Sequence, residues 1–176
     1  MCDNYNHNRY ACCPPPRHNQ CHDSGNGFHQ NFEAFLNAGQ EVQVPPVISS
    51  GIGRANATLD GNILRVNGTF QNLSSDYNPQ IGAHIHLGSA GQNGDIIFTL
   101  SVQPFAGNRS GTFTGTFQLS NAQINSLVNR MFYINIHTFS YPNGEIRGQL
   151  LPTSQPSHNN NHCQSHCQSH CQSHCC

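Results

Sequence analysis

Three histidines in the central part of this sequence could together hold a metal ion. His84 and His86 alternate with apolar residues in the stretch 81–87, so both side chains are expected on one face of a strand, away from the apolar core. In the stretch 132–139, the same alternation turns His137 away from the core on a second strand. Imidazole is a ligand for zinc and copper, and imidazoles at positions i and i+2 project from the same side. A metal site is therefore one interpretation of these residues.

The alternative interpretation gives the same histidines a structural role. Imidazole nitrogens can bond to strand carbonyls and to a carboxylate such as Glu145, which would order a polar face of the sheet. Glu41 and Glu145 are the carboxylates that could serve acid–base chemistry, but the sequence does not indicate how close they lie. We expect both as solvated groups at strand edges.

Motifs that mark a catalytic centre are missing from the sequence. No nucleophile stands beside a base in a recognised motif, and no glycine-rich phosphate loop follows an expected strand. We therefore expect a protein that is not an enzyme. Its histidines and cysteines suit zinc or copper as a bound metal.

Cysteines are confined to the two ends of the chain. None of the nine falls between Cys21 and Cys163. A small domain stapled by disulfides carries its cysteines inside the strands that it joins, so this core is expected to fold without them. Their expected partners are other tails, other molecules or metals. The predicted cross-linking residues are Cys2, Cys12, Cys13, Cys21, Cys163, Cys167, Cys171, Cys175 and Cys176.

Both tails are predicted to be connectors. The N-terminal tail contains three consecutive prolines at 14–16, which form a stiff extended spacer. The C-terminal tail repeats His-Cys-Gln-Ser and has no apolar stripe, so we expect disorder until it is cross-linked or metallated. Covalent cross-linking, binding of zinc or Cu(I), and a passive tail are the alternatives. The candidate metal ligands in this tail are His162, His166, His170 and His174.

Composition predicts a surface that tolerates close packing. Only 9% of the residues are charged, the chain has no lysine, and its formal net charge is −1. Nucleic-acid binding needs clustered Lys and Arg, so no such partner is expected, and no run of about 18 apolar residues predicts a membrane span. Because a net charge near zero favours association, we expect a homo-oligomer or polymer.

The residues that would position the histidines form an all-β domain. Short apolar alternations broken by Gly, Pro, Asn and Asp begin at Phe28. Eight strands in about 120 residues suit two packed antiparallel sheets, so the expected fold is a Greek-key-like β-sandwich. Alternation in the last strand places Glu145, Arg147 and Gln149 on its outer side. The expected strands are 32–37, 50–59, 63–71, 82–88, 95–102, 111–118, 131–139 and 145–150.

One short helix is expected between the last strands. Ser120 is a suitable N-cap, Gln123 completes a capping box, and Ile124, Leu127 and Val128 form an apolar stripe. This stripe is expected to close one end of the sandwich. Turns are predicted at 60–62, 91–94 and 142–144, where Gly stands close to Asn or Asp.

A series of motifs in the predicted domain resembles a known family, the CHRD domain. This is the repeated module of chordin, which also occurs in bacterial proteins. The resemblance covers about residues 31–151, and the motifs that carry it are Gly39-Gln40-Glu41, Val44-Pro45-Pro46-Val47, Ala83-His84-Ile85-His86-Leu87-Gly88, Gly91-Gln92-Asn93-Gly94, Phe132-Tyr133-Ile134-Asn135-Ile136-His137-Thr138 and Tyr141-Pro142-Asn143-Gly144-Glu145-Ile146-Arg147-Gly148-Gln149-Leu150.

The resemblance implies a β-sandwich similar to immunoglobulin or superoxide dismutase domains. It implies no reaction, because a fold alone does not supply one. The His84-x-His86 strand is also similar to the His-x-His strand of copper–zinc superoxide dismutases. A metal-binding or superoxide-dismutase-like redox protein is therefore an alternative function.

The two tails are similar in composition to coat and exosporium proteins of spore-forming bacteria. The N-terminal residues lack the basic and apolar regions of a secretory signal peptide, so we expect synthesis without one and a location at the spore surface. An extracellular location is the alternative.

The chain is thus expected to have three parts: an N-terminal connector (1–27), a CHRD-like domain (28–151) and a repeat tail (152–176). The predicted function is that of a structural protein in a bacterial spore surface layer or fibre, cross-linked to itself and to other coat proteins through its tails. A ligand-binding module using loops such as 76–80 is a further alternative.

Overall fold

The computed structural model describes residues 28–153, which form an all-β domain with one short helix. All nine cysteines and the four histidines of the repeat tail lie outside these residues, as do most of both predicted tails. The elements are β1 (His29–Asn37), the 3₁₀ helix η1 (Ala38–Gln40), β2 (Ile52–Asp60), β3 (Ile63–Gln71), β4 (Ala83–Leu87), β5 (Asp95–Pro104), β6 (Gly111–Gln118), α1 (Asn121–Val128), β7 (Phe132–Ile136), β8 (Ile146–Gln149) and β9 (Leu151–Pro152).

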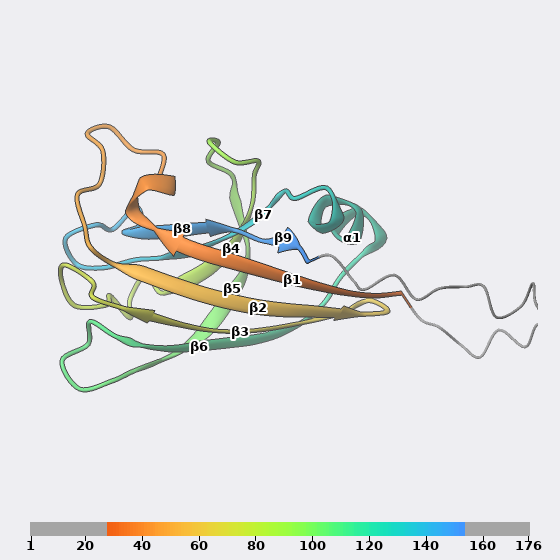
Figure 1. Ribbon diagram of the computed structural model, residues 1–176, viewed down its shortest axis with the longest axis horizontal. Helices are drawn as coiled ribbons and strands as arrows, with labels where there is room; N and C mark the ends of the chain where they lie inside the picture. The colour runs from red at the N-terminus through yellow and green to blue at the C-terminus, as the bar shows by residue number, and fades with distance from the viewer. Residues whose placement is uncertain (1–27, 154–176) are drawn as a thin grey trace, which may run out of the picture.

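The strands form one closed antiparallel barrel (Figure 1). Eight strands follow one another in the order β2-β3-β6-β5-β4-β7-β8-β1, and β1 then pairs with β2 along its whole length to close the sheet. The short β9 adds a ninth strand beside β1. Closure leaves few unpaired strand edges, which are the part of a sheet that recruits other chains.

The expected strands are all present, and the all-β antiparallel fold is confirmed. The difference from the expected sandwich is that the sheet is continuous and closed. A second difference concerns β7, which ends at Ile136 and leaves His137 and Thr138 just beyond it. Beyond this end, Thr138 forms an isolated bridge with Tyr77.

The barrel interior is filled by the apolar residues of the alternating strands. The largest of these side chains with almost no exposure include Phe32, Phe70, Phe113, Ile85 and Ile134. Burial of this apolar surface is the main favourable contribution to folding, at roughly 25 cal/mol per Å².

The helix α1 has the capping box that the sequence predicts. The hydroxyl of Ser120 accepts a hydrogen bond from the backbone N–H of Gln123, whose side chain accepts one from the backbone N–H of Ser120. Leu127 is fully buried and Ile124 packs against the core, so two members of the apolar stripe cover the barrel end. Val128 is 40% exposed, which differs from the prediction.

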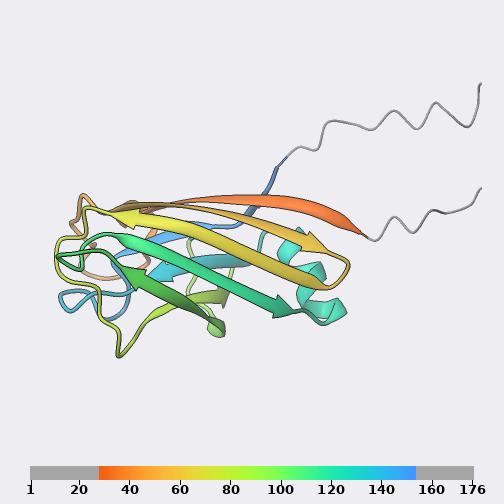
Figure 2. The same ribbon diagram turned by 90° about the horizontal axis from the view of Figure 1, so that it is seen from below.

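The described chain begins and ends at the same end of the barrel (Figures 1 and 2). Phe32 of β1 pairs with Pro152 of β9, and the backbone N–H of Thr153 donates to the carbonyl of Asn31 at 2.9 Å. Both cysteine-rich segments are therefore attached to neighbouring strands. Within residues 28–153, no helix is long and apolar enough to cross a membrane.

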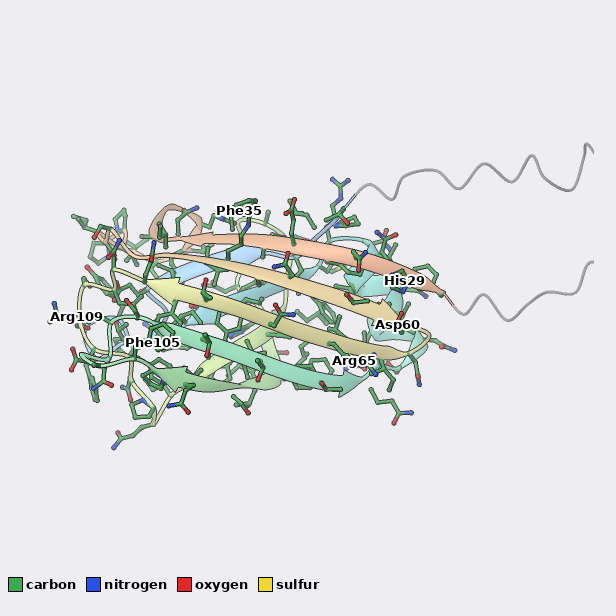
Figure 3. All side chains as sticks on the ribbon, turned by 60° about the horizontal axis from the view of Figure 1, so that its bottom comes forward. His29, Phe35, Asp60, Arg65, Phe105 and Arg109 are labelled. Atoms are coloured by element: carbon green, nitrogen blue, oxygen red, sulfur yellow. The ribbon has the colours of Figure 1, made fainter. Side chains whose placement is uncertain are left out.

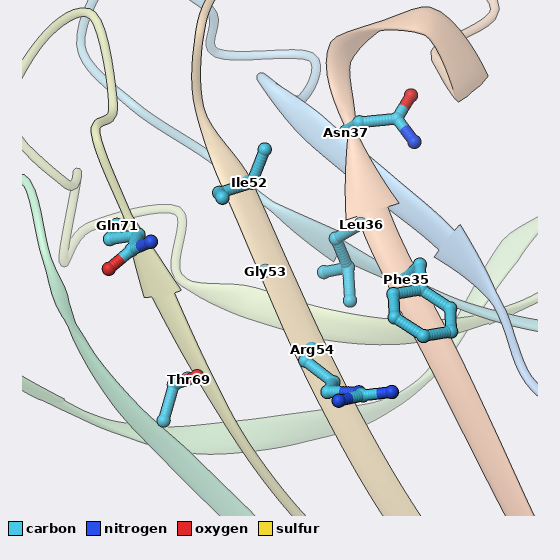
Figure 4. Close-up of a pocket in the computed structure, with 8 residues that line it drawn as sticks. All are labelled: Phe35, Leu36, Asn37, Ile52, Gly53, Arg54, Thr69 and Gln71. Atoms are coloured by element: carbon cyan, nitrogen blue, oxygen red, sulfur yellow. The ribbon is translucent and has the colours of Figure 1, made fainter.

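The outer faces of β1, β2, β3 and β6 carry exposed side chains (Figure 3). His29, Asp60 and Arg65 form a small cluster near the start of β1, in which Asp60 contacts the other two. Further along, a shallow cavity of about 390 Å³ lies over β1, β2 and β3, between Phe35 and Thr69 (Figure 4). Arg54, whose guanidinium lies 4.4 Å from the centre of the Phe35 ring, is its charged group. His84, His86 and His137 lie on or directly after other strands of the barrel.

Candidate metal centre

The outer face of β4, β7 and β8 carries a layer of buried polar side chains. Strand alternation turns these side chains away from the barrel core, as the sequence predicts. In one row across the sheet, His84 pairs with Asn135, and Asn135 with Arg147. In the next row, His86 pairs with Tyr133, which pairs with Gln149. All six side chains are at most 8% exposed.

Loops cover this polar layer and exclude most of the solvent from it. Asn93, from the loop between β4 and β5, donates to the carbonyl of Val42, in the segment that follows η1. Gln43 in turn donates to the carbonyl of Gly144, in the loop between β7 and β8. The loop between β4 and β5 and the segment that follows η1 lie on the same side of the barrel (Figure 1). The outer face is therefore largely covered, although strand alternation alone would leave it exposed.

The structure brings His84, His86 and His137 together. Each offers one ring nitrogen, and these three atoms lie within 4.8 Å of one another. The closest pair is His84 Nδ1 and His137 Nε2, which are 3.3 Å apart. Nitrogen ligands of one tetrahedral zinc ion are separated by about 3.3 Å. The His84–His137 pair already has this separation, and a closer approach of the His86 ring would complete the set.

Backbone carbonyls fix the tautomers of two of these rings. Nδ1 of His86 donates to the carbonyl of Gly94 at 3.0 Å, and Nδ1 of His137 donates to the carbonyl of Pro142 at 2.9 Å. A carbonyl can only accept, so both Nδ1 atoms carry the proton and both Nε2 atoms keep a lone pair. Such carbonyl contacts typically orient histidines that bind metals.

The third ring, that of His84, can bind a metal and remain a neutral imidazole. In the 3.3 Å contact with Nε2 of His137, the donor must be Nδ1 of His84, because the partner atom holds a lone pair. A metal ion would take the place of that proton, which can move to the other nitrogen of His84.

Burial keeps the three imidazoles neutral. It lowers the pKa of His137 to about 4, with a smaller lowering from His84 and His86, against the raising effect of the Pro142 carbonyl. Burial is also the main cause that lowers the pKa of His84 and of His86. Neutral imidazole is the form that binds metals, so little proton competition is expected near pH 7.

The His86 ring is held in a stack with Tyr133 and Arg147. Its ring lies parallel to that of Tyr133, with centroids 4.7 Å apart. The guanidinium of Arg147 lies 3.5 Å from the centre of the Tyr133 ring and donates to the carbonyls of Ser89 and Gln92. The cation–π contact fixes Tyr133, and Tyr133 in turn fixes the orientation of His86.

Glu145 does not contact the histidines and is not solvated, so both expectations for it are wrong. Its carboxylate is fully buried and accepts hydrogen bonds from the Ser49 hydroxyl at 2.5 Å and the Ser74 backbone N–H at 2.6 Å. It also accepts from the Thr138 hydroxyl at 2.7 Å. Because Thr138 follows His137 directly, Glu145 anchors the segment that positions this ring.

The expectation for Glu41 is also wrong. Its side chain is partly buried where it follows η1, in one of the covering segments. Burial raises its pKa to about 7, against the lowering effects of Gln43 and Arg147. Its Oε1 atom is buried without a hydrogen-bond partner. A sequence gives no sign of this, because burial here depends on how three loops meet.

The raised pKa of Glu41 predicts a specific pH dependence of stability. Between pH 4.5, its ordinary pKa, and pH 7, the folded protein binds a proton that the unfolded chain releases, so this group's stabilising contribution is lost as the pH rises. The free energy of unfolding of the metal-free wild type, relative to Glu41→Gln, should fall by up to about 3 kcal/mol across this range.

Denaturant unfolding of both proteins at several pH values measures this difference. The lowered pKa of His137 has the opposite sign, because stability is lost as the pH falls from 6.5 towards 4. That contribution is common to both proteins and cancels in the comparison. A difference that does not change with pH would contradict the assignment.

A polar cavity of about 340 Å³ adjoins the centre on the side of His86. It is lined by His86, Tyr133, Asn135, Asn93, Asn143, Gln43, Gly94, Val42 and Val44. Gly94 and Gly144 border the centre where a side chain would not fit. A Cβ at Gly94 would overlap the carbonyl of Leu87, and one at Gly144 would overlap the Asn135 amide.

Sequence reasoning found the three histidines but missed their surroundings. The alternation that turns His137 away from the core does the same for Tyr133 and Asn135. Their alternation with buried isoleucines, beside a His-x-His strand, is the signal that could have placed them at the site. The candidate ligands His162, His166, His170 and His174 and the cysteines lie outside the described residues.

Fold and site together define a closed antiparallel β-barrel with a buried three-histidine cluster on its outer face. The family model of the CHRD domain matches residues 32–150, close to the expected range. The chain therefore belongs to the CHRD domain family. No curated protein and no solved structure matched this chain.

Proposed function

We propose that the barrel of this CHRD protein is a metal-binding module that holds zinc or copper on His84, His86 and His137. The observation that carries the proposal is the convergence of three neutral, buried imidazoles within 4.8 Å, two of them oriented by backbone carbonyls. We propose a binding role and no enzymatic reaction.

Elemental analysis of the purified protein tests this function. The full-length chain should retain one equivalent of zinc or copper in the barrel, and a variant without residues 158–176 should keep it. Substitution of the three histidines by Gln in the shortened variant should remove it. Metal that disappears with the tail alone would place binding in the repeat, and no metal in any form would overturn the proposal.

For the whole chain, we propose a second, structural role as a cross-linked building block of a bacterial spore surface layer or fibre. The specific observation is that the cysteine-rich segments, which hold all nine cysteines, are attached to neighbouring strands at one end of the barrel. A surface with few charges permits close packing of copies and of other coat proteins.

The two roles use opposite ends of the barrel. The first strand runs from His29, beside the attachment points, to Asn37 at the other end. Asn37 pairs with Arg147, which lies in the same cross-strand row as His84. Cross-linking through the tails would therefore leave the covered metal centre free.

Oxidised full-length protein is expected to form disulfide-linked multimers on a non-reducing gel, and these should collapse to monomer on reduction. A variant with all nine cysteines changed to Ser should stay monomeric while its barrel unfolds at the same denaturant concentration, because residues 28–153 contain no cysteine. Monomeric wild type with nine free thiols under oxidising conditions would rule out this role.

A further inference from the structure

Three buried side-chain atoms in and near the histidine cluster lack a hydrogen-bond partner. Among the described residues, the buried side-chain atoms without a hydrogen-bond partner are Glu41 Oε1, His86 Nε2 and Asn135 Oδ1. His86 and Asn135 line the polar cavity, and Glu41 directly precedes the lining residue Val42. Asn135 is only 4% exposed, so bulk water does not satisfy its oxygen.

The unpaired atoms of His86 and Asn135 are acceptors. Nε2 of His86 holds a lone pair because Nδ1 donates to Gly94, and the amide nitrogen of Asn135 is already directed at the Asn143 carbonyl at 3.4 Å. A buried acceptor without a donor destabilises the folded state. The cavity therefore favours a cation together with a hydrogen-bond donor, and it disfavours an aprotic anion.

The histidine cluster provides too few ligands to complete a metal site. In residues 28–153, His84, His86 and His137 are the members of the group, and no Cys, Asp or Glu of this part joins them. Zinc takes four ligands, and sites with three protein ligands keep a position for water or another small molecule. A cavity of about 340 Å³ has ample room for water molecules with several polar partners.

We infer that the fourth position of the metal faces this cavity and holds an exchangeable water molecule that donates a hydrogen bond to Oδ1 of Asn135. This inference rests on the metal-binding function proposed above. It makes the centre an open site, at which small protic ligands such as imidazole can replace water. Asn135 is a positioning residue for that ligand.

The test uses the relaxation of water protons by Cu(II) bound to the full-length protein. Exchange of a coordinated water molecule transmits the paramagnetism of copper to the bulk solvent. We expect an enhancement of the relaxation rate in proportion to the copper bound at the barrel, and its loss when imidazole is added. This wild-type measurement does not depend on any variant folding.

Two substitutions of matched size locate the water molecule. Asn135→Leu removes the buried acceptor and fills the cavity, so the enhancement should be lost while bound copper, measured by elemental analysis, is retained. Asn67→Leu alters an exposed side chain on β3, outside the cavity, and should leave the enhancement unchanged.

Failure of the inference is distinguishable from failure of the metal-binding function. No copper at the barrel would overturn both. Copper bound by three histidine nitrogens without an enhancement would overturn the open site alone.

Discussion

Saturating zinc is expected to raise the free energy of unfolding of the protein by about 4 kcal/mol when free metal exceeds its dissociation constant a thousandfold. The gain arises because the folded barrel assembles His84, His86 and His137, whereas an unfolded chain binds the metal more weakly. Binding of zinc to the tail cysteines in both states adds little to the difference. Denaturant unfolding with zinc and with a chelator measures the effect.

Two single-histidine variants identify the source of this gain. His84→Gln removes a member of the cluster and should lose most of the zinc-dependent stabilisation. His29→Gln alters a half-exposed histidine that pairs with Asp60, outside the cluster, and should keep it. An equal gain in both variants would show that zinc stabilises the protein from another site.

Glu145→Ala is expected to destabilise the metal-free barrel by about 3–5 kcal/mol. The carboxylate is fully buried, and its removal leaves the Ser49 hydroxyl, the Ser74 N–H and the Thr138 hydroxyl without their acceptor. The loss should appear as a lower midpoint of urea unfolding with the same slope.

Glu33→Ala is the matched control for this substitution. Glu33 is a half-exposed carboxylate whose contact with Arg54 spans 3.9 Å, so its removal should change the free energy of unfolding by less than about 0.5 kcal/mol. Equal losses of stability in the two variants would contradict the anchoring role that we assign to Glu145. Zinc should also stabilise Glu145→Ala less than the wild type, because Thr138 no longer holds the segment that carries His137.

The sequence was sufficient where structure depends on local chemistry. Strand alternation placed His84 and His86 on one face, and the register between β4 and β7 confirms that this face points away from the core. The capping box at Ser120 likewise follows from side chains three residues apart. Both predictions depend on neighbours along the chain, which the sequence contains.

The burial of the polar layer could not be predicted in the same way. A period of two residues assigns a side chain to a face, but it does not say whether another segment covers that face. Glu41 and Glu145 were expected in solvent for this reason. The first lies under covering loops, and the second is enclosed by Ser49, Ser74 and Thr138, which come from three separate segments.

Closure of the barrel is also a property of distant pairing. The first strand pairs with β2, β8 and β9, and the last of these partners is more than a hundred residues away. Eight alternating strands suit either a sandwich or a barrel, so only the complete register separates the two. The same register places the chain ends together and the histidines towards the opposite end.

The most direct test of the metal centre is anomalous X-ray diffraction from crystals of the full-length protein grown with zinc, recorded on both sides of the zinc absorption edge. The structure predicts an anomalous peak within about 2.1 Å of Nδ1 of His84, Nε2 of His86 and Nε2 of His137. A fully loaded crystal with no peak between these rings, or with its peak only at residues of the tail, would contradict the central claim.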